Sequence, residues 1–96
     1  MKILAITRLL PGATFEKIQA LQVPEVTEVW RMINQDFVRE IYFDKDKPCV
    51  VLVVEADSVN TARERLASLP MVEAKLFEFD FTVLGPFIQL AHLFAR

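Results

Sequence analysis

The acidic residues near the C-terminal end of the chain are the first candidates for chemistry. Glu78 and Asp80 alternate with phenylalanines in the segment 75–84, KLFEFDFTVL, so both carboxyl groups lie on one face of a predicted strand. Along a strand they would be about 7 Å apart, close enough to share a pocket or a cation. If both groups are buried together, one acquires a raised pKa and serves as a general acid or base. The alternative is a solvated edge strand.

Two arginines and a tyrosine could complete such a site. Arg8 or Arg39 would bind the carboxylate of a substrate, and Tyr42 would form a wall or donate a hydrogen bond. The first functional hypothesis is therefore a cofactor-independent enzyme in which Glu78 or Asp80 moves a proton beside a carbonyl group. The second hypothesis is a non-catalytic homodimer that uses the same cavity to bind a small molecule, or that serves as an assembly module.

The single histidine and the single cysteine carry less chemistry. His92 lies in an apolar terminal segment, so we expect it to be packed or solvent-facing rather than catalytic. Cys49 follows Pro48 at the start of a predicted strand, where a small core residue is expected. One histidine and one cysteine do not supply the four ligands of a structural metal site, and the sequence contains neither a glycine-rich phosphate loop nor a nucleophile elbow. We expect no metal and no cofactor.

Four strands and two helical regions must position these residues. The predicted strands are 1–10, 37–43, 50–54 and 75–84, and the predicted helical regions are 14–35 and 58–69. The first and third strands are apolar on both faces, whereas the other two carry charges. The order βαββαβ is that of ferredoxin-like α+β folds, which place the first and third strands in the centre of a four-stranded antiparallel sheet. In the first helical region Val26, Trp30 and Ile33 form an apolar stripe, so we expect Trp30 in the core.

Length and composition limit what can cover this sheet. The chain has 96 residues, of which 53% are hydrophobic and two are glycines, and this predicts a single domain, 1–96, without long flexible linkers. Too little chain is left for a second layer of helices. Leaving Val51 and Val53 in water would forfeit about 3 kcal/mol, at roughly 1.5 kcal/mol each. We therefore expect a second copy of the protein to cover that face of the sheet.

The C-terminal segment 85–96 is unusually apolar for a terminus. As a helix it would bring Phe87, Leu90, Ala91 and Phe94 together. Termini of this kind are normally held in place, so the segment either packs on the sheet of its own subunit or clasps a partner at a dimer interface.

Charge and hydropathy indicate where the protein works. The net charge of −2 gives no general attraction to nucleic acid. No apolar segment approaches the roughly 20 residues that span a bilayer, and the N-terminal residues lack the apolar stretch and cleavage site of a signal peptide. A lone cysteine fits a reducing compartment. We expect a cytoplasmic protein that binds neither nucleic acid nor membrane.

The segment 55–70, EADSVNTARERLASLP, resembles the strand-to-helix segment of the muconolactone isomerase-like family, which has an acid, a Ser-Val pair and a terminal Leu-Pro at the same spacing. Arg39 and Tyr42 fall where that family has an arginine and a tryptophan, and 84–86 is similar to its strand exit. The histidine of the family's first strand is missing. The resemblance, which covers residues 37–86, implies a dimeric α/β-barrel with two sheets packed face to face and isomerisation of a small lactone or carboxylic acid.

Overall fold

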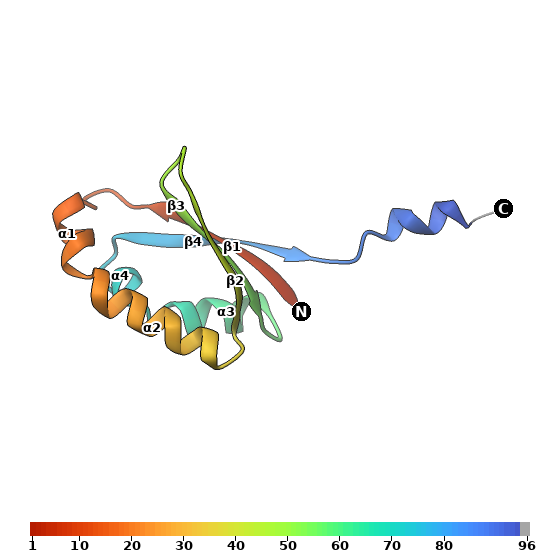
Figure 1. Ribbon diagram of the computed structural model, residues 1–96, viewed down its shortest axis with the longest axis horizontal. Helices are drawn as coiled ribbons and strands as arrows, with labels where there is room; N and C mark the ends of the chain where they lie inside the picture. Colours follow the sequence, from red (N-terminus) through yellow and green to blue (C-terminus); the bar gives the residue numbers. More distant parts are fainter. Residues whose placement is uncertain (95–96) are drawn as a thin grey trace.

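The strands form one antiparallel sheet with the helices on one of its faces (Figure 1). This arrangement is seen in a computed structural model that describes residues 1–94. The elements are β1 (Lys2–Leu9), α1 (Phe15–Ala20), α2 (Gln22–Asn34), β2 (Val38–Asp44), β3 (Cys49–Glu55), α3 (Val59–Leu66), α4 (Pro70–Glu73), β4 (Phe77–Leu84) and the 3-10 helix η1 (Ile88–Leu93). The strand order is β2-β3-β1-β4. The predicted ferredoxin-like α+β fold, with the two apolar strands in the centre, is confirmed.

The predicted helix starts are also observed. The side chain of Thr14 accepts a hydrogen bond from the backbone N–H of Lys17 at 3.2 Å, and Ser58 accepts one from Thr61 at 3.1 Å. Both residues therefore satisfy a donor that the first helical turn leaves without a partner. The first helical region consists of two consecutive helices, α1 and α2. The second predicted region ends before Pro70, and Pro70 begins the short helix α4. A proline fits at the first helical position because its missing N–H would have no partner within the helix there.

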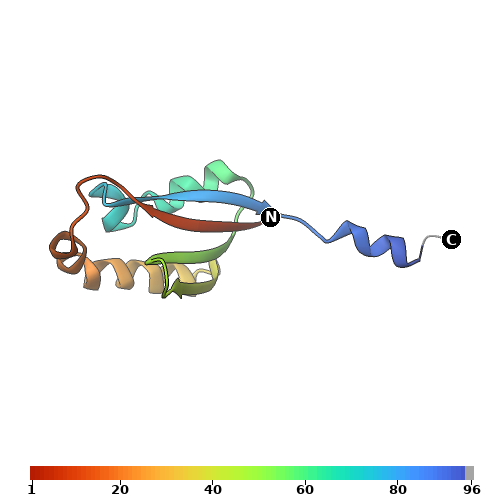
Figure 2. The ribbon, with the colours of Figure 1, turned by 90° about the horizontal axis from the view of Figure 1, so that it is seen from above.

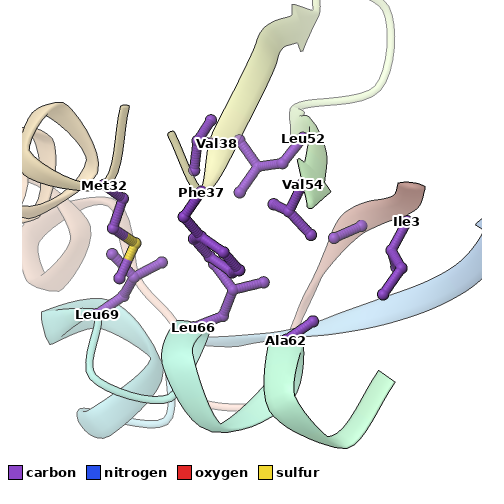
Figure 3. Packing of buried hydrophobic residues seen from close by; sticks show 10 residues of the cluster. Ile3, Met32, Phe37, Val38, Leu52, Val54, Ala62, Leu66 and Leu69 are labelled. Atoms are coloured by element: carbon purple, nitrogen blue, oxygen red, sulfur yellow. The ribbon is translucent and has the colours of Figure 1, made fainter. Parts of the chain in front are cut away.

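Side chains from one face of the sheet form the hydrophobic core with the helices. Strand pairing places Ile3 opposite Val54, and both are fully buried. Figure 3 shows Phe37, which precedes β2, pointing between α2 and Leu66 of α3. The guanidinium of Arg65 lies 4.3 Å from the centre of the Phe37 ring and covers it from the outside. Phe37 therefore joins the sheet to both helical regions.

The two helical regions end in the same way. Asp36 after α2 and Lys75 after α4 have left-handed backbone conformations, with φ of 60° and 59°. In each case the residue that follows donates its backbone N–H to the carbonyl five residues earlier, at 3.1 and 2.9 Å. These are Schellman motifs, which satisfy carbonyls at a helix C-terminus and turn the chain sharply. Each motif returns the chain directly into an edge strand of the sheet.

The other face of the sheet is left open. Its centre consists of Leu4, Ile6, Val51 and Val53, which the register brings together in pairs across β1 and β3. Neighbouring side chains leave the first three half-buried and Val53 only 8% exposed. Helices α1–α4 all lie on the opposite side of the sheet, and η1 lies beyond the end of β4 (Figures 1 and 2). We call these four residues and their neighbours on the same side of the sheet the open face.

The C-terminal segment does not pack on its own sheet. Figures 1 and 2 show residues 85–94 running away from the end of β4, and the long axis of the molecule is 59 Å. Phe87 is 66% exposed and Phe94 82% exposed. Of the two alternatives for the segment, packing on its own subunit is not observed in residues 85–94. The described helices also include none with the length and apolar character needed to cross a membrane.

The expectation that Trp30 lies in the core is also wrong, since its side chain is 65% exposed. Helix α2 instead turns Glu25, Val29 and Met32 toward the sheet. This stripe has the spacing i, i+4, i+7, and it lies about 100° around the helix from the stripe that contains Trp30. Helix α2 therefore buries the carboxyl group of Glu25 and leaves the indole of Trp30 exposed.

Candidate functional site

A cavity of about 520 Å³ lies between the sheet and helices α1 and α2. Its wall is formed by aliphatic, aromatic and sulfur-containing side chains, among them Cys49, with three polar exceptions: Thr7, Gln22 and Glu25. Its rim includes Phe15, which is 75% exposed. The volume falls within the range of about 300–1,000 Å³ that is typical of pockets for small organic molecules.

The cavity begins where β1 and β3 stop pairing. The paired register of these strands ends at Ile6 and Val51. One residue further, the hydroxyl oxygen of Thr7 accepts the backbone N–H of Val50 at 2.8 Å. A side chain thus replaces the backbone partner of Val50, and the two strands separate without leaving a buried donor unpaired.

Glu25 is the only acid that lines this cavity among residues 1–94, and its side chain is buried, at 7% exposure. Its carboxyl oxygen Oε1 accepts the backbone N–H of Met71, at the start of α4, at 2.9 Å. Burial raises the pKa of Glu25 above its ordinary value of 4.5, the Met71 hydrogen bond opposes that rise, and the charge of Glu28 adds to it. Glu25 therefore holds its proton more tightly than an exposed glutamate does, which makes it a candidate for proton transfer.

The raised pKa of Glu25 predicts a pH dependence of stability. Between the ordinary and the raised pKa, the folded protein retains a proton that the unfolded chain releases, so the free energy of unfolding falls as pH rises. Glu25→Gln should remove this fall while keeping an acceptor for the Met71 N–H. The stability of the variant relative to wild type should therefore increase between about pH 4 and about pH 8, measured by urea unfolding.

Glu64→Gln on the exposed side of α3 is the matched control for this measurement. It removes the same charge without touching the cavity, and its stability relative to wild type should stay constant over that pH range. A Glu25→Gln curve parallel to wild type would show that the folded and unfolded chains hold the Glu25 proton equally well.

Three of the five residues expected at the site come together on the open face. Arg8 on β1 lies opposite Glu78 on β4 and forms ion pairs with Glu78 and, at 3.3 Å, with Asp80. The hydrogen bonds of Asp80 and Glu78 raise the pKa of Arg8 further. All three side chains are about half exposed or more. In the single chain the two carboxylates thus share a cation, as predicted, but they are not buried together.

Arg39 and Tyr42 lie on the edge strand β2, which β3 and β1 separate from β4. Tyr42, opposite Val51, is on the same face of the sheet as Arg8 but at its other edge. The Nε of Arg39 donates to the backbone carbonyl of Asp36 at 2.6 Å. The hydroxyl of Tyr42 donates to Glu40 Oε1 at 2.9 Å, and this interaction raises the pKa of Tyr42. Neither residue belongs to the Arg8 cluster, and neither lines the large cavity.

A second, smaller cavity of about 220 Å³ lies between α3, α4 and β4. Arg63, Glu78 and Phe81 contribute to its wall, and the guanidinium of Arg63 lies 5.2 Å from the centre of the Phe81 ring. No group of three or more histidine, cysteine, aspartate or glutamate side chains within residues 1–94 is arranged to hold a metal ion.

No protein-family model and no curated protein sequence matches the chain. Among solved structures it is similar to 5-chloro-2-hydroxyhydroquinone dehydrochlorinase (TftG) from Burkholderia phenoliruptrix AC1100, in complex with 2,5-dihydroxybenzoquinone, with a TM-score of 0.71 and 15% identity over 88% of this chain and 94% of that chain. It is also similar to an uncharacterized NIPSNAP domain protein from Burkholderia xenovorans, with a TM-score of 0.47 and 22% identity over 91% and 97% of the two chains. The similarity to the dehydrochlorinase shows a shared ferredoxin-like fold.

Proposed function

We propose that this protein is a cofactor-independent isomerase that binds a small, neutral, cyclic carbonyl compound in the large cavity and moves a proton on it with Glu25. The observation that carries the proposal is a buried carboxyl group of raised pKa on the wall of an otherwise apolar cavity of about 520 Å³. General acid–base catalysis is most effective when the pKa of the catalytic group lies near the working pH.

The charge of the cavity wall favours a neutral ligand. Among residues 1–94, neither a lysine nor an arginine lines the cavity. A substrate carboxylate placed there would lose its hydration without gaining a cationic partner, which is costly. Of the two substrate classes expected from the sequence, a lactone therefore fits better than a carboxylic acid. The ligand in the similar dehydrochlorinase structure, 2,5-dihydroxybenzoquinone, is also a ring with carbonyl groups.

The proposed reaction needs only groups of this chain. The Glu25 carboxylate takes a proton from the carbon beside the carbonyl, and the electron pair of the C–H bond moves onto the carbonyl oxygen as an enolate forms. The oxygen of Thr7 accepts the Val50 N–H, and its own O–H would donate to the enolate oxygen. Protonated Glu25 then returns the proton to another carbon of the conjugated system. A double bond shifts, and neither an oxidant nor a reductant is consumed.

Two other functions have specific observations in their favour. The Arg8–Glu78–Asp80 cluster joins acids to an anion-binding cation, and it would become an enclosed proton-transfer site if a second copy covered the open face. A non-catalytic small-molecule-binding protein would use the same large cavity without proton transfer.

The single cysteine agrees with a reducing compartment, and we propose a cytoplasmic location on that ground.

Ligand binding is tested by screening unsaturated lactones and hydroxyquinones, each beside a carboxylate analogue, by NMR in D₂O. Neutral rings should bind, carboxylates should not, and the ligand should incorporate deuterium beside its carbonyl group. Val29→Trp, which fills the cavity, should weaken binding by at least about tenfold. The matched control is Val23→Trp, since Val23 is 73% exposed on the same helix and does not line the cavity.

Each outcome of the screen decides between the hypotheses. Equal binding by the Val29→Trp and wild-type proteins, with the fold of the variant intact in its amide spectrum, would exclude the large cavity as the site. Binding without any deuterium incorporation would favour the non-catalytic alternative over the isomerase.

A further inference from the structure

Buried residues form the inner wall of the large cavity, and exposed residues form its mouth. The inner wall is at most 8% exposed and includes both groups of the proposed reaction, Thr7 and Glu25. At the mouth, Gln22 is exposed, as are five large apolar side chains that we call the rim. The rim residues are 44–75% exposed: Leu9, Phe15, Val26, Ile41 and Phe43. The reactive groups are therefore enclosed, and the opening to solvent is mainly apolar.

The rim is assembled from four elements, β1, α1, α2 and β2, that meet around the mouth. On β2, Ile41 pairs with Leu52 and Phe43 with Val50, so all four residues lie on the cavity side of the sheet. Exposed apolar side chains that gather around one opening indicate a binding surface. The rim thus extends the wall of the cavity outward.

The cavity is too large for an unsubstituted lactone. The six non-hydrogen atoms of a five-membered unsaturated lactone take up less than about 180 Å³, even at the roughly 30 Å³ that each water molecule occupies in the liquid. About two-thirds of the cavity volume of about 520 Å³ would then remain. Water in that space would lie against a mainly apolar wall, and an apolar group that displaces poorly ordered water gains affinity.

Building on the proposed function, we propose that the substrate is a lactone that carries an apolar chain of up to about ten carbons, the number that the remaining space admits at the same volume per atom. The ring lies against the inner wall, with the carbon that loses its proton beside Glu25. The chain runs along the rim side chains toward solvent. Recognition then has two separate parts, the acid for the ring and the rim for the chain.

A series of unsaturated lactones with methyl, butyl, hexyl and octyl chains tests this proposal on the full chain of the protein. The Kd, measured by isothermal titration calorimetry, should fall about two- to fourfold for each added methylene, because each one loses its contact with water. The heat-capacity change of binding should become more negative along the series, which is the signature of apolar burial.

Phe43→Gln on the rim should remove most of the preference for long chains. Phe43 is 62% exposed on an edge strand, so the fold should be kept. The Kd of the octyl lactone should rise about tenfold, and that of the methyl lactone should stay within about threefold of wild type. Phe87→Gln is the matched control, because Phe87 is 66% exposed and does not line the cavity; both Kd values should stay within about threefold.

Chain length separates this proposal from the isomerase activity on which it rests. Equal Kd values for the methyl and octyl lactones, or equal effects of the two variants on the octyl lactone, would overturn the role of the rim even if the lactones incorporate deuterium. Chain-dependent binding without deuterium incorporation would support the rim and count against the isomerase. Failure of every lactone to bind would overturn both proposals.

Discussion

Replacing Glu25 by glutamine is expected to slow deuterium incorporation into a cavity-bound lactone by about 10²–10⁴-fold, the usual contribution of a general base. The amide oxygen of glutamine still accepts the Met71 N–H, so the local structure should be kept. A carboxamide, however, neither takes nor returns a proton at neutral pH. The Kd of the lactone should stay within about threefold, because the shape of the cavity is preserved. Both quantities come from one NMR titration in D₂O.

The pH dependence of this reaction identifies the base. The wild-type rate should rise with pH as Glu25 loses its proton and should level off above the raised pKa, since only the carboxylate accepts the substrate proton. Glu78→Gln and Asp80→Asn are the controls, because both change an acid of the open face. If these variants lose the activity and Glu25→Gln retains it, the catalytic group lies in the Arg8 cluster instead.

Replacing Phe37 by alanine is expected to lower the free energy of unfolding by about 3–5 kcal/mol, the range for large aromatic residues in a core. Phe37 is 1% exposed, belongs to the main core cluster and lies beneath the guanidinium of Arg65. A cavity at this point would separate β2 from both helical regions. Because domains of this kind are stable by about 5–15 kcal/mol, the variant should be close to unfolding.

Urea unfolding measures this loss, and Phe15→Ala is the matched control. Phe15 is 75% exposed, so the same change of side chain should cost less than about 1 kcal/mol. Similar losses for the two variants would mean that Phe37 does not contribute more to stability than a surface aromatic residue.

The strands and their order in the sheet could be predicted from two features of the sequence. Side chains alternate in polarity along a strand, and central strands are more apolar than edge strands. The apolar runs in β1 and β3 on both faces indicated central strands, and the charges in β2 and β4 indicated edges. The same alternation placed Glu78 and Asp80 on one face, close enough to share a cation, but left open whether Arg8 or Arg39 would supply it; strand pairing brings Arg8 beside them. Arg39 and Tyr42 did not join them, because β2 and β4 are opposite edges of the sheet.

Helix α2 shows where the sequence was insufficient. Two overlapping stripes run along it, one through Trp30 and one through Glu25, and only their contacts with the rest of the chain decide which faces inward. The deciding hydrogen bond joins Glu25 to Met71, 46 residues away. Hydrophobicity favoured the wrong stripe, so neither the buried acid nor the cavity beneath it could be found from the sequence.

The matching Schellman motifs after α2 and α4 point to an internal pseudosymmetry. Each half of the chain is a strand, two helices, a left-handed residue and a returning edge strand. The halves differ in the space they enclose, about 520 Å³ under the first pair of helices and about 220 Å³ under the second. The first half of the chain thus encloses more than twice the space that the second half does, although both halves are built from the same succession of elements.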